Sequence, residues 1–230
     1  MRAVKITPED AEYPALLREA PRRPLFLFRA GAPVPNKPAV AVVGTRDPTE
    51  KGRELARKIG AELARRGCAV ATGLARGIDE AAALGAKEAG GHVIAVLPYI
   101  YENGALLNKA LWRLSYNSLT VLSLHLAKED KRVKTWLMER NWIISGISAA
   151  VVVAEAKFRS AGWGTAHTVR FAAEMGRRVL IAEPQANDGD VIKGFKELVK
   201  MGAVPVPDAD KVVEEACREA VQRWRGGNSA

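Results

Sequence analysis

The chain has few of the residues that most often carry catalysis or cross-linking. Its 230 residues include two cysteines, Cys68 and Cys217, and three histidines. Two isolated cysteines cannot form a multi-disulfide framework, and their spacing is not that of metal ligands. None of the histidines has a serine or cysteine partner that the sequence makes visible. We therefore expect no metal site and no set of catalytic side chains.

Long apolar runs are also missing. No run approaches the roughly 18 residues that predict a membrane-spanning helix, and the first residues, Met1 to Lys5, do not resemble an apolar signal segment. These two absences predict a soluble, cytoplasmic protein that makes no membrane contact.

Acidic residues are outnumbered. There are 35 Lys and Arg against 26 Asp and Glu, which gives a net charge of +9. An excess of this kind favours polyanions such as nucleic acid or an anionic lipid surface, without choosing between them. Hydrophobic residues make up 48% of the chain. That content can bury the core of one large domain, or of a domain with a small appendage.

From residue 39 onward, short runs rich in valine and isoleucine alternate with longer helical patterns. This alternation is typical of βαβ units around a buried parallel sheet. The expected strands are residues 39–43, 68–72, 93–97, 119–123, 149–154, 178–182 and 203–206. Helices are expected between them, including 50–66 and 208–224. The sequence therefore predicts an α/β fold, a Rossmann-like, doubly wound and mostly parallel sheet, over residues 38–230.

The first 37 residues have a different pattern. Thr7 and Pro8 followed by two acidic residues predict a helix that runs towards Ala20. A short strand is expected at 25–28, followed by a connector rich in proline and glycine. We expect residues 1–37 to form a small, helical N-terminal extension.

Three loops after predicted strands contain glycine and can receive an anion. In an open parallel sheet, ligands bind beyond the carboxyl ends of the strands. Backbone N–H groups at helix starts and arginine side chains suit phosphate. The loops are residues 44–49, 73–79 and 160–165. They match neither the dinucleotide-binding nor the triphosphate-binding glycine motif, so NAD and ATP are disfavoured and no cofactor is expected.

Several segments match a known family in order along the chain. Ala41 to Arg46 is similar to its V-G-S-R motif and Thr72 to Asp79 to its S-G-L-A-R-G-I-D motif, and residues 140–148 and 152–156 match further motifs. Over about residues 6–206 the sequence resembles the DNA-processing protein A family, DprA or Smf. Residues 99–136 depart from the family pattern. The resemblance implies single-stranded DNA binding, loading of a RecA-type recombinase during natural transformation, and a homodimer.

The leading hypothesis is a non-enzymatic single-stranded DNA binder whose arginines and loop N–H groups contact phosphates. The candidate nucleic-acid-binding residues are Gly44, Thr45, Arg46, Gly73, Arg76, Gly77, Arg140, Asn141, Gly162, Gly164 and Thr165. Trp142 or Trp163 would stack a base, or else pack in the core. The basic run at 128–134 either extends the binding groove or is a solvated helix face. The last helix has an apolar face that either pairs with a second copy or packs on its own sheet.

Two other classes of function stay open at this stage. Gly162 to Thr165 partly matches the P-G-G-x-G-T-x-x-E motif of the lysine-decarboxylase-like nucleotide phosphoribohydrolases. Thr168 stands where that motif has its catalytic Glu, so hydrolysis would need Glu155 or Glu174 as a substitute. A sensor of small nucleotides, using the same phosphate loops without turnover, is the third possibility.

Overall fold

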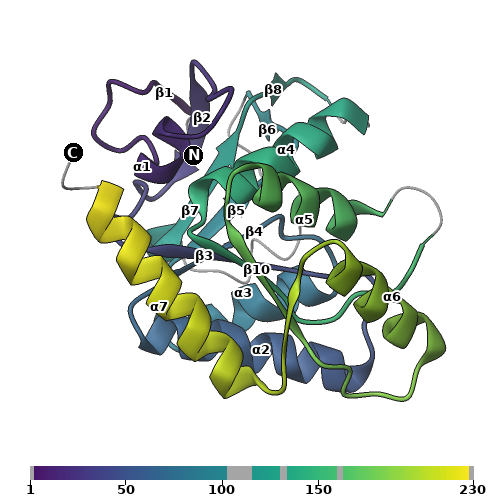
Figure 1. The fold of residues 1–230 in the computed structure, drawn as a ribbon. Helices are drawn as coiled ribbons and strands as arrows, with labels where there is room; N and C mark the ends of the chain where they lie inside the picture. Colours follow the sequence, from purple (N-terminus) through teal and green to yellow (C-terminus); the bar gives the residue numbers. More distant parts are fainter. Residues whose placement is uncertain (1–2, 103–115, 130–133, 160–162, 228–230) are drawn as a thin grey trace.

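A parallel sheet forms the centre of the molecule (Figure 1). The computed structural model describes residues 3–102, 116–129, 134–159 and 163–227. Within these residues the main sheet has the order β1-β2-β7-β5-β4-β3-β9-β10-β11, and β7 to β11 in this order are parallel. The strands are β1 Val4–Ile6, β2 Leu27–Gly31, β3 Ala39–Val43, β4 Ala69–Thr72, β5 Val93–Val96, β7 Leu119–Ser123, β9 Ala150–Val153, β10 Arg178–Ala182 and β11 Val204–Val206.

Helices cover both faces of this sheet, which confirms the predicted doubly wound α/β fold. The helices are α1 Ala15–Arg18, α2 Glu50–Arg65, α3 Ile78–Glu88, α4 Lys134–Ile147, α5 Gly164–Glu174, α6 Gly189–Lys200 and α7 Ala209–Gly227. Helices α2, α3 and α7 share one core cluster, and α4, α5 and α6 share the other. Strand β3 contributes side chains to both clusters: Val40 and Val42 pack in the first, and Ala41 and Val43 pack in the second. Its uninterrupted apolar run therefore reflects burial on both faces.

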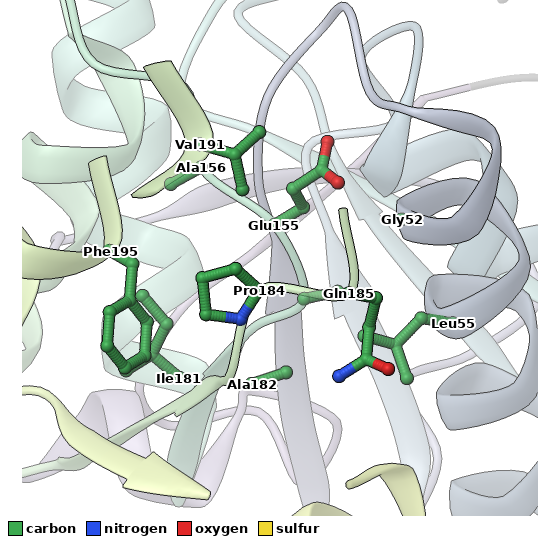
Figure 2. A pocket seen from close by; sticks show the side chains of 11 residues that line it. Gly52, Leu55, Glu155, Ala156, Ile181, Ala182, Pro184, Gln185, Val191 and Phe195 are labelled. Atoms are coloured by element: carbon green, nitrogen blue, oxygen red, sulfur yellow. The ribbon is translucent and has the colours of Figure 1, made fainter. Parts of the chain in front are cut away.

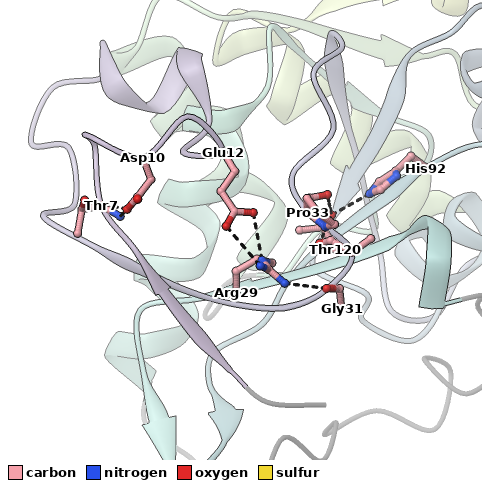
Figure 3. A network of polar contacts seen from close by, with 9 residues as sticks. Thr7, Asp10, Glu12, Arg29, Gly31, Pro33, His92 and Thr120 are labelled. Carbon is pink, nitrogen blue, oxygen red and sulfur yellow. Dashed lines mark hydrogen bonds and ion pairs between the residues drawn. The ribbon is translucent and has the colours of Figure 1, made fainter.

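The N-terminal segment differs from the predicted helix over residues 8–20. Helix α1 covers only Ala15–Arg18, because the chain before it is closed into turns. The Asp10 carboxylate accepts hydrogen bonds from Thr7 N at 2.7 Å and from Thr7 Oγ1 at 2.9 Å (Figure 3). Pro14, the residue before α1, also has no N–H to donate to a helix that started earlier.

Residues 4–31 also add two strands that complete one edge of the sheet. Strand β1, which the sequence did not predict, pairs antiparallel with β2, and β2 pairs antiparallel with β7. Arg29 fixes this edge through an ion pair with Glu12 at 3.2 Å and a hydrogen bond to Gly31 O at 2.8 Å (Figure 3). The N-terminal segment thus extends the same sheet. A unit boundary near residue 37 stays a prediction.

His92 has a structural role at the same end of the molecule. Its Nε2 lies 2.8 Å from Thr120 Oγ1, and that hydroxyl also donates to Pro33 O at 2.9 Å (Figure 3). Burial lowers the pKa of His92 to about 4. The neutral imidazole therefore helps to tie the connector before β3 to β7.

The last helix packs on its own sheet. Val212, Val213, Ala216 and Ala220 of α7 are fully buried in the cluster beneath α2 and α3. These four side chains are therefore already buried inside the chain. The same packing brings Cys217 of α7 next to Cys68, which immediately precedes β4. The two buried sulfurs lie 3.3 Å apart as free thiols.

Candidate nucleic-acid interface

The sheet reverses its winding direction between β3 and β9. From β3 the chain continues to β4, β5 and β7 on one side, whereas β9 leads to β10 and β11 on the other. Such a switch point creates a crevice at the carboxyl ends of the two strands, where ligands of open α/β sheets bind. Gly44 directly follows β3 and Glu155 lies two residues after β9. The first predicted loop therefore opens at this crevice.

The first and second glycine loops are locked to each other through their backbones. Thr45 N donates to Glu155 O at 2.9 Å, and Ile78 N donates to Thr45 O at 3.2 Å. A Cβ added at Gly44 would lie 2.5 Å from Glu155 O, and one added at Gly77 would lie 2.5 Å from Thr45 O. Gly77 also has a φ of +97°, which side chains rarely adopt. These glycines are needed for the close approach of the two loops.

The start of α2 already holds an anion from the chain itself. The Glu155 carboxylate accepts hydrogen bonds from Thr49 N at 2.8 Å and from Thr49 Oγ1 at 2.5 Å. Thr49 Oγ1 in turn accepts from Gly52 N at 3.0 Å and caps the helix. The sequence predicted that free N–H groups here would receive a phosphate. In the structure, the buried Glu155 carboxylate occupies that position.

Arg46 and Arg76 lie on the exposed side of the two locked loops. Arg76 Nε donates to Arg46 O at 3.3 Å, so the two side chains start from neighbouring points. Neither forms an ion pair with any side chain in the described part of the chain. Asp79, at the end of the second loop, is buried and accepts from Gly73 N at 3.1 Å and Ala75 N at 3.4 Å, so it does not pair with Arg46. Two uncompensated guanidinium groups therefore point to solvent at this edge.

Arg140 of α4 lies against the second loop. Its Nη2 donates to Gly73 O at 2.9 Å and its Nη1 to Asn141 Oδ1 at 2.7 Å. A Cβ added at Gly73 would lie 2.0 Å from the guanidinium carbon, so only glycine leaves room for it. Burial lowers the pKa of Arg140, while the nearby carboxylate of Asp79 opposes this shift. Arg140 thus positions the loop and adds positive charge beside Arg46 and Arg76.

The third loop joins the other two through Asn141. The buried Asn141 donates from Nδ2 to Gly164 O at 3.4 Å, at the first residue of α5. Thr165 is buried in the first turn of that helix. Gly162 lies outside the described residues. The structure therefore brings ten of the eleven predicted site residues to one region, although several of them hold the loops together and do not face solvent.

Both candidate tryptophans pack against other side chains. Trp142 has the Arg22 guanidinium 4.6 Å from its ring and meets Phe171 edge-on at 5.4 Å. Trp163 meets Phe158 edge-on at 5.6 Å and joins the core cluster on that face. This packing matches the core alternative that the sequence left open. Within the basic run, Lys128 and Lys134 are exposed, and Lys131 and Arg132 lie outside the described residues.

Sequence reasoning missed a basic and aromatic extension of this edge beyond β9. Lys193 of α6 lies 4.0 Å from the ring centre of Phe158, and Lys157 pairs with Asp188 at 3.1 Å. Phe158 N also donates to Asp190 O, which fixes the loop to the start of α6. In the sequence, the only sign of this extension was that Lys157 and Phe158 follow a predicted strand. Their contacts with residues in and just before α6 depend on the fold and could not be predicted.

A pocket opens beside the crevice, between α2 and α6. Its lining is mostly apolar and includes Leu55, Pro184, Val191 and Phe195, with Glu155 at one side (Figure 2). The Glu155 carboxylate lies against Gly52 and binds Thr49, so it is not directed at a ligand in the pocket. Glu174 pairs with Arg22 and Arg170 and does not line the pocket. Neither carboxylate is placed as the substitute that hydrolysis would need.

The described residues contain no group of three or more His, Cys, Asp or Glu side chains that could hold a metal ion. They also contain no helix with the length and apolarity needed to cross a bilayer.

Known proteins show the same sequence pattern and fold. The family model for DNA recombination-mediator protein A matches residues 5–217. This chain belongs to that family. It is 34% identical over 211 residues to the DNA processing protein DprA of Streptococcus pneumoniae, covering 90% of this chain and 72% of that protein. It is 32% identical over 209 residues to Protein Smf of Synechocystis, covering 86% of this chain and 50% of that protein.

Solved structures of DprA proteins share the fold. The X-ray structure of DprA from Streptococcus pneumoniae superimposes with a TM-score of 0.77 at 31% identity, covering 94% of this chain and 75% of that one. A DprA structure from Helicobacter pylori, described for its single-stranded DNA binding mode, gives 0.76 at 20% identity, covering 94% and 97%. The chain spans about half the length of several curated DprA and Smf relatives.

Proposed function

We propose that this DprA family protein binds single-stranded DNA, without catalysis, through the phosphates of the strand. The observation that carries the proposal is the pair of exposed guanidinium groups of Arg46 and Arg76 on two mutually locked loops, with Arg140 beside them. Two exposed cations without carboxylate partners among the described side chains favour a polyanion. The net charge of +9 favours a long polyanion over a small nucleotide.

The phosphates contact the side chains of Arg46 and Arg76 and not the start of α2. Glu155 occupies that helix start, so a phosphate approaching the first loop meets the arginines on the outer surface. Loop glycines 44, 73 and 77 contribute by letting the loops pack closely. Lys193 beside Phe158 extends the positive surface past β9.

Family membership supports a role in recombination. The Helicobacter pylori relative is described by its single-stranded DNA binding mode, and the family name denotes a recombination mediator. We accordingly propose that the protein assists a RecA-type recombinase in the cytoplasm and acts as a homodimer. Of the five apolar residues of α7 that the sequence offered for pairing, all but the half-buried Val221 are buried in the chain, so we place the dimer contact on another surface.

A titration of labelled single-stranded and duplex oligonucleotides of equal length, across a range of salt concentrations, tests this function. We expect tighter binding of the single strand, because the glycine loops offer no helix or ribbon that reads the major groove of a duplex. Equal or stronger duplex binding would contradict the proposal. Release of free base from AMP, lost in Glu155→Gln, would instead place the protein among the phosphoribohydrolases.

A further inference from the structure

Four aromatic side chains form a cluster outside the arginine loops, which we call the aromatic ledge: Tyr99, Tyr101, His125 and Trp136. The rings of His125 and Trp136 stack with centres 4.2 Å apart and planes 14° apart. Tyr99 meets Trp136 edge-on at 5.9 Å and Tyr101 edge-on at 5.5 Å. These residues fall in the part of the sequence that departs from the family motifs.

The ledge lies on the same edge of the sheet as the arginine loops. Tyr99 follows β5 and His125 follows β7, so both come from the carboxyl ends of parallel strands. Trp136 is four residues before Arg140 on α4, which places their Cβ atoms about 5–6 Å apart on one helix face. Arg140 in turn touches Gly73. The ledge therefore borders the proposed phosphate path along α4.

A small parallel sheet and an ion pair hold the ledge in place. Strands β6 Ile100–Tyr101 and β8 Leu126–Ala127 pair beside α4 (Figure 1). Ile100 N donates to His125 O at 3.0 Å, and His125 Nε2 lies 2.6 Å from Glu139 Oε2. The histidine ring is thus fixed from both its backbone and its side chain. Rigid aromatic rings lose little conformational entropy when a ligand stacks on them.

The ledge is more open than a core cluster. Tyr99 is buried, but Trp136 and Tyr101 are half-buried and the His125 side chain is 26% exposed. Along the sequence, exposed Lys128 and Lys134 and exposed Glu102 and Glu129 all lie within four residues of a ledge residue, and Glu139 is engaged by His125. Trp142, further along the same helix, has Arg22 over its ring and Phe171 at its edge. Trp136 is packed in a similar way, with His125 stacked on one face and Tyr99 at its edge, so a base would stack on the face opposite His125.

We propose that the aromatic ledge is a base-stacking site for single-stranded nucleic acid and that Trp136 is its principal platform. The inference rests on the proposed function and adds to it where the strand continues after the arginine loops. Phosphates bind at Arg46 and Arg76, and the following bases stack on the ledge beside α4. Stacking needs only an aromatic face, so the site accepts any base.

The test compares two ligands of equal length and charge. One is an oligothymidylate, and the other is an abasic deoxyribose-phosphate strand that keeps the phosphates and lacks the bases. We expect Trp136→Ala to weaken binding of oligothymidylate on the order of tenfold, the loss of one stacked base. Binding of the abasic strand should be unchanged. Trp136→Phe should restore most of the affinity, whereas Trp136→Leu, which fills space without a ring, should not.

Leu137→Ala is the matched control, since Leu137 is the exposed neighbour of Trp136 on α4 and outside the ledge. It should bind both strands like the unmodified protein. If the unmodified protein binds neither strand, the proposed function fails. If it binds both and Trp136→Leu matches it on oligothymidylate, the tryptophan only fills space and the stacking site is wrong while the proposed function stands. Equal weakening of both strands by Trp136→Ala and Trp136→Phe would also overturn the stacking site.

Discussion

At the residue scale, the site is decided by which side chains are paired and which are not. Arginine is a residue type typical of nucleic-acid binding and aspartate one typical of catalysis, yet here Arg140 and Asp79 both hydrogen-bond to the backbone of Gly73 and hold it in place. Glu155 similarly satisfies the start of α2. Arg46 and Arg76 keep their charges without a carboxylate partner among the described residues. A cation that neutralises a phosphate releases counterions condensed on the nucleic acid, so binding through these two arginines should weaken as the salt concentration rises.

Replacing Arg46 by alanine therefore tests the phosphate contact directly. We expect Arg46→Ala to weaken single-strand binding by a similar factor for all base sequences. The slope of log affinity against log salt should fall in magnitude by roughly 0.7, the value for one phosphate of a single strand. The melting temperature should barely change, because Arg46 is exposed and Asp79 does not depend on it.

Arg65→Ala is the control for Arg46, since it removes an exposed charge at the far end of α2. It should leave the salt slope unchanged. An Arg46→Ala protein with a lower melting temperature and an intact slope would mean that Arg46 has a structural role. An unchanged slope with normal stability would remove Arg46 from the interface.

At the element scale, strands and long helices follow local patterns, and short elements do not. Helix α2 was expected at 50–66 and spans Glu50–Arg65, because Thr49 caps it and its apolar residues recur at helical spacing. Helix α1 and strands β1, β6 and β8 are two to four residues long. Such segments are set by their neighbours, because a few residues cannot offset the entropy of ordering by themselves.

The contact between the second loop and α4 gives a prediction at this scale. Gly73→Ala places a methyl group about 2 Å from the Arg140 guanidinium, so the side chain must leave the loop. We expect weaker single-strand binding and a free energy of unfolding lower by about 1–3 kcal/mol, because the displaced guanidinium loses its hydrogen bond to Gly73 O and its place beside the Asp79 carboxylate. Binding titrations and denaturant unfolding measure the two effects. Gly189→Ala is the control, because a methyl group at Gly189 has no neighbour within 4 Å, and it should change neither binding nor stability. A Gly73→Ala protein with unaltered binding and stability would refute the contact between Gly73 and Arg140.

At the scale of the whole molecule, distant parts of the chain meet across the sheet. Cys68 and Cys217 are 149 residues apart, yet their sulfurs lie 3.3 Å apart between β4 and α7. The hydrogen bond from Cys68 lowers the pKa of Cys217, and the same bond raises the pKa of Cys68. Either thiol can attack once it has lost its proton, since the thiolate is the reactive form, and the other sulfur lies within reach.

The short distance between the two sulfurs predicts that the azo oxidant diamide converts the two thiols into a disulfide. One thiolate attacks the azo group, the other thiol displaces the nitrogen of that adduct to form the disulfide, and the two hydrogens pass to the reduced hydrazine. We expect a mass loss of about two hydrogens and a gain of about 2–4 kcal/mol in stability, typical of one disulfide. Intact mass and unfolding in denaturant measure both. Cys217→Ser should show neither change, and two free thiols left after oxidation of the folded protein would contradict the prediction.

Local patterns were enough to predict the α/β class, the main strands and the family, because buried parallel strands need continuous apolar runs and tight loops need glycine at particular positions. They also placed Arg46 and Arg76 after strand ends. Which charged groups pair depends instead on the folded arrangement of the strands. Glu155 reaches Thr49 across 106 residues and Arg140 reaches Gly73 across 67. The order of strands fixes such contacts, and local sequence patterns do not record that order. The same holds for Trp136, whose aromatic neighbours Tyr99 and His125 follow two different strands, β5 and β7.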